Sequence, residues 1–554
     1  MLKTWLNKET KSIKGGAIIL AFSSLASRIL GILRDRILAS FFGASDMLDI
    51  YYASFQIPDF FYNIFILGTL SVAFIPIFTT YIYNSNGKTS EFYDESLEFT
   101  NTILNMVIIC MGAGCLTLLF FTPILVKFVA PGFSGEKYNI TITITRIMLI
   151  SPFIFSLSSI LSSILTSYKR FLAISFAPIF YNLGIIFGAI VLTPLFGIKG
   201  LSIGVIIGAV LHVLVQIPPI KKLGYKYKIN INLKNIKVKE FGRLFFPRII
   251  GIDISQASLL IGSIIGSYLT KGSIAIFNLA NNLQSLPTGI FGISLVSSVF
   301  PHLSGAFARN DLEQFREDFY KTISQILFFL IPSSIFLFIL RKNIIELILK
   351  AGKFESKDVL LTSAVLGYFC LSLIPQGVTP LFLRSFYSMH DTITPVVINV
   401  ICICIDIAAS LWFTMLLGNS NLFHNISMQI YGFSSNEDIR VLGLAMGFSI
   451  SSWITLIILY IFLRMRIKNL YAKRIFISFI KFLISSVLAG TAIYFILYNI
   501  NKFWQTQTLW VLIITTGLSG IIGILVYLFA CWILGSNVSN LLTTEARRLE
   551  RKDY

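Results

Sequence analysis

The stretch Ala21-Phe-Ser-Ser-Leu-Ala-Ser-Arg28-Ile-Leu-Gly-Ile-Leu-Arg34-Asp35-Arg36-Ile-Leu-Ala-Ser-Phe-Phe-Gly-Ala44 is apolar and long enough to cross a bilayer, yet it carries four charged residues. A charge near the middle of a lipid-facing helix costs roughly 2.5 to 3.5 kcal/mol on insertion scales, so such residues normally face a bundle interior or a water-filled cavity. The segment therefore predicts a membrane helix whose charges mark a functional site.

The composition predicts an all-α polytopic membrane protein. Hydrophobic residues make up 55% of the chain, only 13% are charged, and the mean hydropathy is +0.79, which excludes a soluble globule of ordinary surface. The net charge of +19 fits basic loops between apolar spans, which orient a protein in its membrane. Because no face outside the spans combines aromatic and basic residues, we expect no nucleic-acid partner.

Motifs for cofactors are absent from the sequence. The six cysteines lie in apolar stretches without metal-ligand spacing, and no Gly-x-x-x-x-Gly-Lys-Ser/Thr loop occurs. We therefore expect no cofactor other than a coupling ion, and transport driven by membrane potential or an ion gradient. The Lys-rich start leads into the first span without a small-residue cleavage site, so we expect no cleaved signal peptide.

Apolar runs of about 20 residues predict fourteen transmembrane helices. Most Lys and Arg residues lie in loops that are cytoplasmic if the N-terminus is inside, which predicts a multi-pass protein of the cytoplasmic (inner) membrane with both termini cytoplasmic. One loop, predicted at 341–358, is basic on the outer side and disagrees with this bias. The predicted helices centre near residues 28, 65, 112, 157, 186, 210, 258, 290, 330, 370, 404, 455, 488 and 522.

An internal repeat divides the predicted helices into two lobes. The segment from Tyr51 through Ile57-Pro58 to Pro76 is similar to the one from Ala280 through Leu286-Pro287 to Pro301, and Pro178…Asn182 is similar to Pro395…Asn399. Repeated lobes with broken helices are typical of alternating-access transporters. We expect a first six-helix lobe (1–222), a basic cytoplasmic linker (223–240), a second six-helix lobe (241–470), two additional helices (471–536) and a cytoplasmic tail (537–554).

These motifs, in this order, resemble the MurJ (MviN) lipid II flippases of the multidrug/oligosaccharidyl-lipid/polysaccharide exporter superfamily, over nearly the whole chain. The matching segments are Ser27-Arg28-Ile-Leu-Gly-Ile-Leu-Arg34-Asp35, Phe42-Gly43-Ala44-Ser-Asp46, Ile57-Pro58, Ala130-Pro131-Gly132-Phe133, Ala177-Pro178, Leu286-Pro287-x-Gly289-Ile-Phe-Gly292 and Phe386-Tyr387-Ser388-x-x-Asp391-Thr392-x-Thr394-Pro395.

The resemblance implies a transporter rather than an enzyme, which moves undecaprenyl-diphosphate-linked peptidoglycan precursor (lipid II) to the outer leaflet for cell-wall synthesis and cell shape. It implies a cationic central cavity for the diphosphate and a groove for the lipid tail beside the last two helices. By position, Arg28, Arg34 and Asp49 match cavity residues of the family. The implied partners are lipid II, membrane lipids and the cell-wall synthesis machinery.

The chain departs from the family pattern at two places. An arginine pair that some members carry after the Ile-Pro step is Tyr62-Asn63 here, and an Asp-Arg pair ahead of the second Leu-Pro is Asn281-Asn282. We infer that Arg248 in the seventh span supplies second-lobe charge in place of an arginine at 282. The predicted substrate-binding residues are therefore Arg28, Arg34, Asp49, Arg248, Asn281 and Asn282.

Arginine suits a diphosphate because its planar fork stays protonated when desolvated. Arg28 and Arg34 are separated by about 240° around an ideal helix, so both face one phosphate only if the helix bends or the cavity wraps around it. The alternative interpretation is that Arg34, Asp35 and Arg36 lie at the end of the span and pair with one another or extend to the interface.

Acidic residues inside apolar helices suggest a coupling ion. Asp253, Asp406 and, one turn beyond Asp406, Ser410 offer the oxygen ligands that Na⁺ prefers. Some members of the resembling family bind sodium in the second lobe. The alternative is that Asp253 neutralises Arg248.

Four other functions stay open from the residues. A flippase for another lipid-linked oligosaccharide would share these features, whereas a small-cation exporter would be expected to line its cavity with carboxylates. A polytopic cell-envelope glycosyltransferase usually needs a large external loop with catalytic groups, and the longest one here, about 419–440, is short. A scaffold in cell-envelope assembly stays open because the arginine pairs of some family members are missing here.

Overall fold

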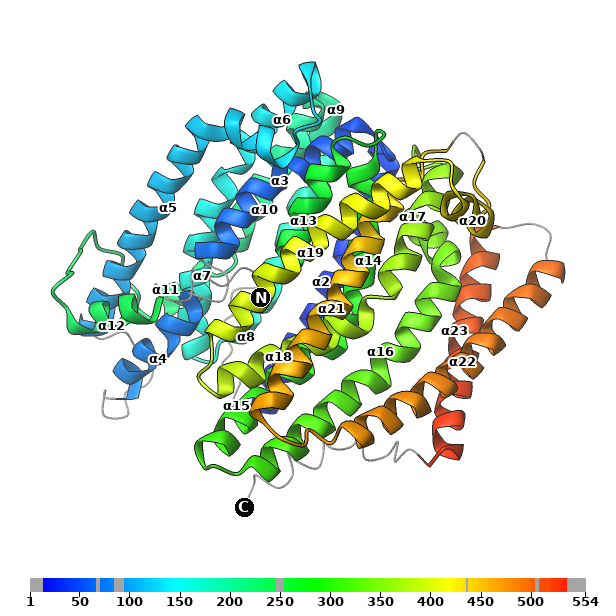
Figure 1. Cartoon of the computed structure of the whole chain (residues 1–554). Coiled ribbons are helices and arrows are strands. Elements are labelled where there is room, and N and C mark those ends of the chain that lie inside the picture. Colours follow the sequence, from blue (N-terminus) through cyan, green and yellow to red (C-terminus); the bar gives the residue numbers. More distant parts are fainter. Residues whose placement is uncertain are drawn as a thin grey trace. The chain divides into compact units, whose positions relative to one another are not determined.

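The computed structural model describes residues 13–65, 70–83, 94–245, 254–434, 437–503 and 508–535. Within these ranges all regular structure is helical, which confirms the predicted all-α class (Figure 1). Contacts divide the chain into two compact units. Unit 1 is Met1–Ala275 with Ala351–Phe354, and unit 2 is Ile276–Lys350 with Glu355–Tyr554.

Unit 1 contains the helices from α2 to α13, and the first residues of α14 also belong to it. Their bounds are α2 (Ile13–Phe42), α3 (Asp46–Phe65), α4 (Leu70–Tyr83), α5 (Asp94–Val129), α6 (Gly135–Met148), α7 (Ile150–Ser167), α8 (Phe171–Phe187), a π-helical turn (Gly188–Leu192), α9 (Thr193–Phe196), α10 (Ile198–Leu214), α11 (Ile217–Lys222), α12 (Ile236–Phe245) and α13 (Ile254–Gly266).

Glycines bring α8 and α10 together in unit 1. A Cβ built on Gly184 would lie 2.3 Å from the Cα of Gly208, and one on Gly204 would lie 2.5 Å from the Cα of Gly188. Small residues at a helix interface let the backbones approach, which is how helices associate where no hydrophobic effect drives them. The close packing fixes α8, and α8 in turn packs along α2, the helix with the arginines.

Unit 2 contains the remaining helices. Their bounds are α14 (Ser273–Pro287), a π-helical turn (Thr288–Ile293), α15 (Ser294–Ala308), α16 (Leu312–Leu349), α17 (Ser356–Cys370), α18 (Leu373–Ser388), α19 (Ile393–Gly418), α20 (Leu422–Tyr431), α21 (Leu442–Arg466), α22 (Ala472–Phe503) and α23 (Leu509–Ile533).

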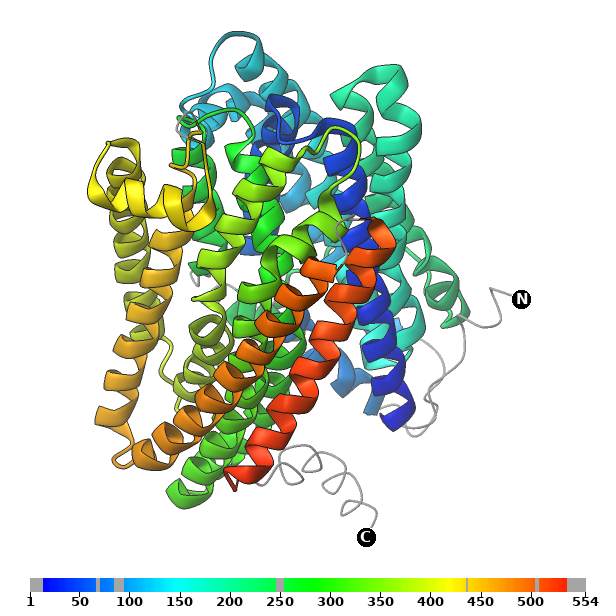
Figure 2. The ribbon, with the colours of Figure 1, turned by 90° about the vertical axis from the view of Figure 1, so that its right-hand side faces the viewer.

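The last two helices pack on α16. In Figures 1 and 2, α22 and α23 run side by side, and Tyr527 on α23 donates a hydrogen bond from its hydroxyl to the carbonyl of Phe328 on α16 at 2.7 Å. Their other faces expose large apolar side chains, including Phe495 and Trp532. Such faces are stable in a membrane because lipid tails are as apolar as the side chains.

Ten described helices or helix pairs are long and apolar enough to cross a membrane, and α17 with α18, bent by 43°, makes an eleventh. The fourteen predicted centres all lie in or at the end of described helices, several of which are too short or too polar to pass the same test. The count of fourteen therefore stays a prediction, consistent with the structure. The basic loop predicted at 341–358 begins too early, because α16 continues to Leu349 and Arg341 stacks on the rings of Phe338 and Tyr431.

The repeat has a counterpart in two turns, one in each unit. Lys169 (φ 55°) follows α7 and His390 (φ 61°) follows α18. In both turns the next residue donates its N–H five residues back, from Arg170 to Leu165 and from Asp391 to Phe386. This bond satisfies a carbonyl that the helix end leaves open. The lobe and linker boundaries remain predictions, and contacts alone place α12 and α13 in unit 1.

Candidate functional site

Arg34 lies on α2 with its guanidinium fixed by two partners. Its Nε and Nη2 donate to Oδ1 of Asp35 at 3.0 and 2.8 Å, and its Nη1 donates to Oδ1 of Asn182 on α8 at 3.2 Å. The Arg34 side chain is 23% exposed and that of Asp35 is 9% exposed. The structure thus contains the Arg34–Asp35 pairing of the alternative interpretation, together with a partner that the sequence did not reveal.

Asn182 is oriented by the helix on which it lies. Its Nδ2 donates to the carbonyl of Pro178, one turn earlier on α8, at 3.1 Å and to the carbonyl of Ser27 on α2 at 3.4 Å. With its amide nitrogen held in this way, Asn182 turns its oxygen to Arg34. The Pro178…Asn182 motif therefore positions the arginine.

Arg28 lies on α2 as well, about one and two-thirds turns before Arg34, and is half-buried. It has polar or electrostatic interactions within the protein. Its role in cargo binding stays a prediction. Tyr62 occupies one of the two positions where some family members carry an arginine pair. Its ring centroid lies 5.6 Å from that of Phe155, so Tyr62 contributes to an aromatic core and not to the charge of the site.

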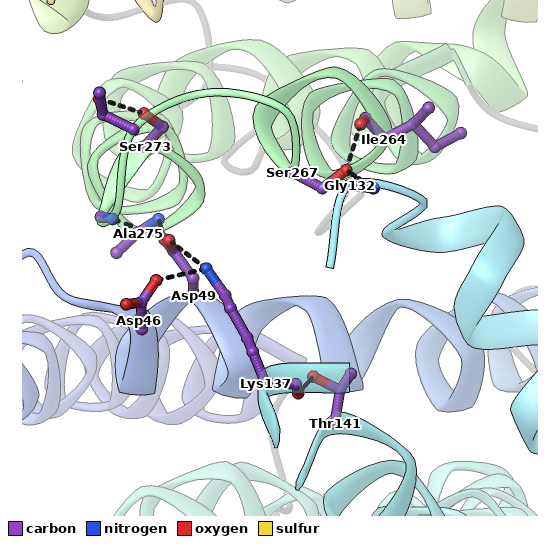
Figure 3. Close-up of polar contacts among 11 residues, drawn as sticks. Asp46, Asp49, Gly132, Lys137, Thr141, Ile264, Ser267, Ser273 and Ala275 are labelled. Atoms are coloured by element: carbon purple, nitrogen blue, oxygen red, sulfur yellow. Dashed lines mark hydrogen bonds and ion pairs between the residues drawn. The ribbon is translucent and has the colours of Figure 1, made fainter. Parts of the chain in front are cut away.

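Asp49 lies in the first turns of α3 and is 1% exposed. Its Oδ2 accepts from the backbone N–H of Gly272 at 2.7 Å and its Oδ1 from that of Ala275 at 2.9 Å (Figure 3). These N–H groups belong to the start of α14, where a helix leaves its donors open and favours negative charge. Asp49 therefore caps α14, and its contact with cargo stays a prediction.

Lys137 on α6 completes this cluster. Its Nζ bonds to Oδ1 of Asp46 at 2.5 Å and lies 3.4 Å from Oδ2 of Asp49 (Figure 3). The same Nζ lies 4.0 Å from the centroid of the Phe133 ring. The lysine compensates the buried carboxylate, which would otherwise be costly. We name Asp46, Asp49 and Lys137, with the backbone of Gly272 and Ala275, the α14 latch.

Glycines of the quoted motifs allow close backbone approaches near the latch. A Cβ on Gly132 would lie 2.2 Å from the carbonyl oxygen of Ser267, whose hydroxyl accepts from the Gly132 N–H at 2.9 Å. Gly272 (φ +86°) similarly approaches Ala44. These positions need glycine because a side chain would push the segments apart.

In unit 2, the predicted Asn281 belongs to a chain of amides. Gln284 is 1% exposed and donates to Asn281 at 2.9 Å, while Gln376 on α18 donates to Gln284 at 3.0 Å and to Ser372 at 2.6 Å. Asn282 accepts from the hydroxyl of Ser285 through its carbonyl. Sequence reasoning missed Gln284 and Gln376, although two glutamines inside apolar helices signal such a pair.

The structure describes two of the three predicted ion ligands, Asp406 and Ser410. Ser410 donates to Oδ1 of Asp406 at 3.3 Å, both side chains are buried, and Ser410 packs against Gly447 of α21. One turn further, the buried hydroxyl of Thr414 makes no hydrogen bond. These oxygens have the chemistry of a hard-cation site. Arg248 and Asp253 lie outside the described residues, and no group of three His, Cys, Asp or Glu able to hold a metal occurs within the described part.

Known proteins share both sequence and fold with this chain. Residues 38–515 match the family described as lipid II flippase MurJ. The chain belongs to the MurJ family. Relatives named probable lipid II flippase MurJ include one from Buchnera aphidicola subsp. Acyrthosiphon pisum, 32% identical over 94% of this chain and 98% of its own, and one from Borreliella burgdorferi, 28% identical over 94% and 96%.

Among solved structures, a lipid II flippase MurJ in an inward closed conformation has a TM-score of 0.71 at 24% identity, covering 96% of this chain and 99% of its own. An inward-facing multidrug transporter of the MATE family reaches 0.61 at 15% identity, over 81% and 99%. These likenesses show the fold. Membership of the MurJ family makes the chain a lipid II flippase, a membrane transporter rather than an enzyme.

Proposed function

We propose that the chain flips lipid II by alternating access, with the anionic diphosphate taken up by arginines of α2. The observation that supports this proposal is the fixed guanidinium of Arg34 on the largely apolar helix α2, held by Asp35 of the same helix and by Asn182 of α8. A buried arginine without an anion is costly, so Asp35 serves as its partner until a cargo phosphate takes that place. Because Arg offers several donors in one plane, Asn182 keeps its bond during the exchange.

The α14 latch provides the second element of the cycle. Asp49 belongs to α3 and the N–H groups that it accepts belong to the start of α14, which continues into unit 2. Movement of α14 away from α3 requires both bonds to break and leaves Asp49 with Lys137 alone. We propose that the latch is intact in one access state and broken in the other.

The basic loops support placement in the bacterial cytoplasmic membrane with both termini cytoplasmic. Asp406 and Ser410 support a Na⁺ site completed by Asp253, which would couple transport to an ion gradient. Delivery of lipid II to the outer leaflet implies the cell-wall synthesis machinery as the recipient of the cargo.

The test replaces Arg34 in cells depleted of their own flippase and measures how much lipid II becomes accessible at the outer face. Arg34→Ala should abolish exposure of lipid II at normal protein levels, and Arg34→Lys should restore it in part, since a point charge lacks the planar fork. The matched control is Arg309→Ala, which removes an exposed arginine between α15 and α16. Wild-type exposure of lipid II with Arg34→Ala would refute the proposed role, and accumulation of a different lipid-linked sugar on depletion would identify another cargo.

A further inference from the structure

The segment between α11 and α12 is held against the first turns of α5 by two asparagines. The hydroxyl of Tyr225 donates to Oδ1 of Asn101 at 2.6 Å, and that of Tyr227 donates to Oδ1 of Asn105 at 2.7 Å. The amide of Asn105 donates to the carbonyls of residues 228 and 230, both at 3.0 Å. We call residues 225–235 the linker loop.

The linker loop turns back after these contacts. The N–H of Asn232 donates to the hydroxyl of Thr102 at 3.2 Å, and its side chain donates to Glu98 at 2.5 Å. The chain therefore runs along α5 from the level of Asn101 to that of Asn105 and returns toward Glu98. Residues 229–231 form the tip, and they lie at the level of Asn105.

The sequence of α5 gives the depth of this tip in a membrane. From Met106 to Val126 the helix has no charged residue. At 1.5 Å per residue this stretch is about 30 Å long, the thickness of a hydrocarbon core. Lys127 is exposed at the far end, and Asn105 directly precedes the near end. The tip of the linker loop thus lies at the boundary between the hydrocarbon and the headgroups.

The side chains of the loop fit this boundary. Ile229 is 87% exposed and Ile231 is 43% exposed at the tip. Lys226, Lys228 and Lys234 are exposed around it, and residues 221–239 contain seven lysines and no acidic residue. Isoleucines exposed in this way are unfavourable in water and favourable at the acyl boundary, while the surrounding lysines match the charge of anionic headgroups.

We propose that the linker loop is an interfacial anchor, in which Ile229 and Ile231 insert at the acyl boundary and the lysines bind anionic phospholipid headgroups. The asparagine contacts make this anchor preorganised, because the loop is fixed to α5 by backbone carbonyls, amides and tyrosine hydroxyls. None of these bonds uses a lysine side chain. The charges can therefore be removed without releasing the loop.

The experiment places a nitroxide at position 229 of the full-length protein, in a background with the exposed Cys110 and Cys404 changed to Ser. The protein is reconstituted in nanodiscs of phosphatidylcholine alone or with phosphatidylglycerol, and collision rates with oxygen and with a water-soluble nickel chelate report depth. A label at Arg309 gives the aqueous reference. We expect the ratio of the oxygen to the nickel-chelate collision rate to be higher at 229 than at 309 and higher in phosphatidylglycerol nanodiscs than in phosphatidylcholine alone. The ratio should fall several-fold in Lys226→Gln/Lys228→Gln, because each lysine contributes about 1 kcal/mol of attraction to anionic headgroups.

The matched control is Lys468→Gln/Lys473→Gln, which removes the same charge from two exposed positions, one in the turn before α22 and one in the first turn of α22. It should leave the depth of the label unchanged. A label at 229 that stays aqueous in both lipids overturns the anchor and favours a protein partner. A label equally deep in both lipids overturns the assignment of anionic headgroups. Neither result depends on flipping, so failure of the anchor is distinct from failure of the proposed function.

Discussion

Replacing Asp49 by alanine tests the α14 latch. The substitution removes both acceptors of the Gly272 and Ala275 N–H groups, which lie 2.7 and 2.9 Å from the carboxylate, and it leaves Lys137 with the exposed Asp46. Loss of a helix cap costs about 0.5 to 2 kcal/mol, and an unsatisfied buried donor costs about 1 to 3 kcal/mol. Once the helix end opens, water can bond to the freed N–H groups and offset part of these costs. We therefore expect Asp49→Ala to destabilise the latched state by about 2 kcal/mol relative to the open state. This is roughly a 30-fold change in its population.

The assay measures access to the start of α14. A cysteine introduced at Ser273, which is 1% exposed, is labelled with an impermeant maleimide in a background with Cys110 and Cys404 changed to Ser, where the four remaining native cysteines are buried. Asp49→Ala should speed labelling by about 10- to 30-fold, and Asp49→Asn by less, since the amide keeps one acceptor.

Asp46→Ala is the matched control for the latch. It removes a carboxylate on the same turn of α3 that also bonds to Lys137 but is 51% exposed. Exposed ion pairs contribute about 0 to 1 kcal/mol, so labelling should change no more than a few-fold. Equal labelling rates in wild type, Asp46→Ala and Asp49→Ala would refute the latch.

Three further predictions concern packing, pH and ions. Gly204→Ala should lower stability by about 1 to 3 kcal/mol in detergent melts, because its Cβ would lie 2.5 Å from the Cα of Gly188, while Gly517→Ala, with nothing within 4 Å of its Cβ, should not. Burial would raise the pKa of Asp391, but hydrogen bonds from Thr394 and the charge of Arg466 outweigh it and hold the pKa below its usual range. The carboxylate therefore stabilises the fold above its unfolded pKa, and Asp391→Asn should lose stability in melts at pH 7, with the difference vanishing as pH falls through the folded pKa. Finally, Na⁺ should raise the melting temperature relative to equal K⁺, and Asp406→Asn should abolish that difference; equal melting in both salts would exclude the ion site.

The sequence was sufficient to predict the fold class because hydrocarbon permits few structures. Backbone groups must be satisfied within each span, so long apolar runs specify helices, and the glycines and prolines of the motifs mark where backbones approach or bend. It predicted less well where helices end. The segment 341–358 was expected to be a loop, whereas α16 continues to Leu349 and the charge of Arg341 rests on aromatic rings.

The partners of the site residues could not be predicted in the same way. Arg34 and Asp49 could be singled out from the sequence because each is a charged residue in an apolar helix. The free-energy cost of burying such a charge depends only on the residue and on the span that contains it. Asn182, which holds Arg34 from 148 positions away, and Lys137, 88 positions from Asp49, are set by how the helices pack. Sequence periodicity records which face of a helix is apolar, but it carries no information on which helix that face meets.

Two buried carboxylates, Asp35 on α2 and Asp49 on α3, have partners of different kinds. Asp35 pairs with Arg34 from the adjacent position, so this pair moves with α2 and does not depend on the access state. Asp49 instead bonds to the start of α14, so its bonds change whenever α3 and α14 separate. In the proposed mechanism, exchange of Asp35 for a cargo phosphate acts on binding, while a change at Asp49 acts on the conformational equilibrium. Variants of the two residues should therefore have different effects. Asp35→Asn should alter the concentration dependence of lipid II transport, and Asp49→Asn should alter the labelling rate of Ser273→Cys. If both variants changed both properties to the same extent, cargo binding and latch opening would be a single step in this protein.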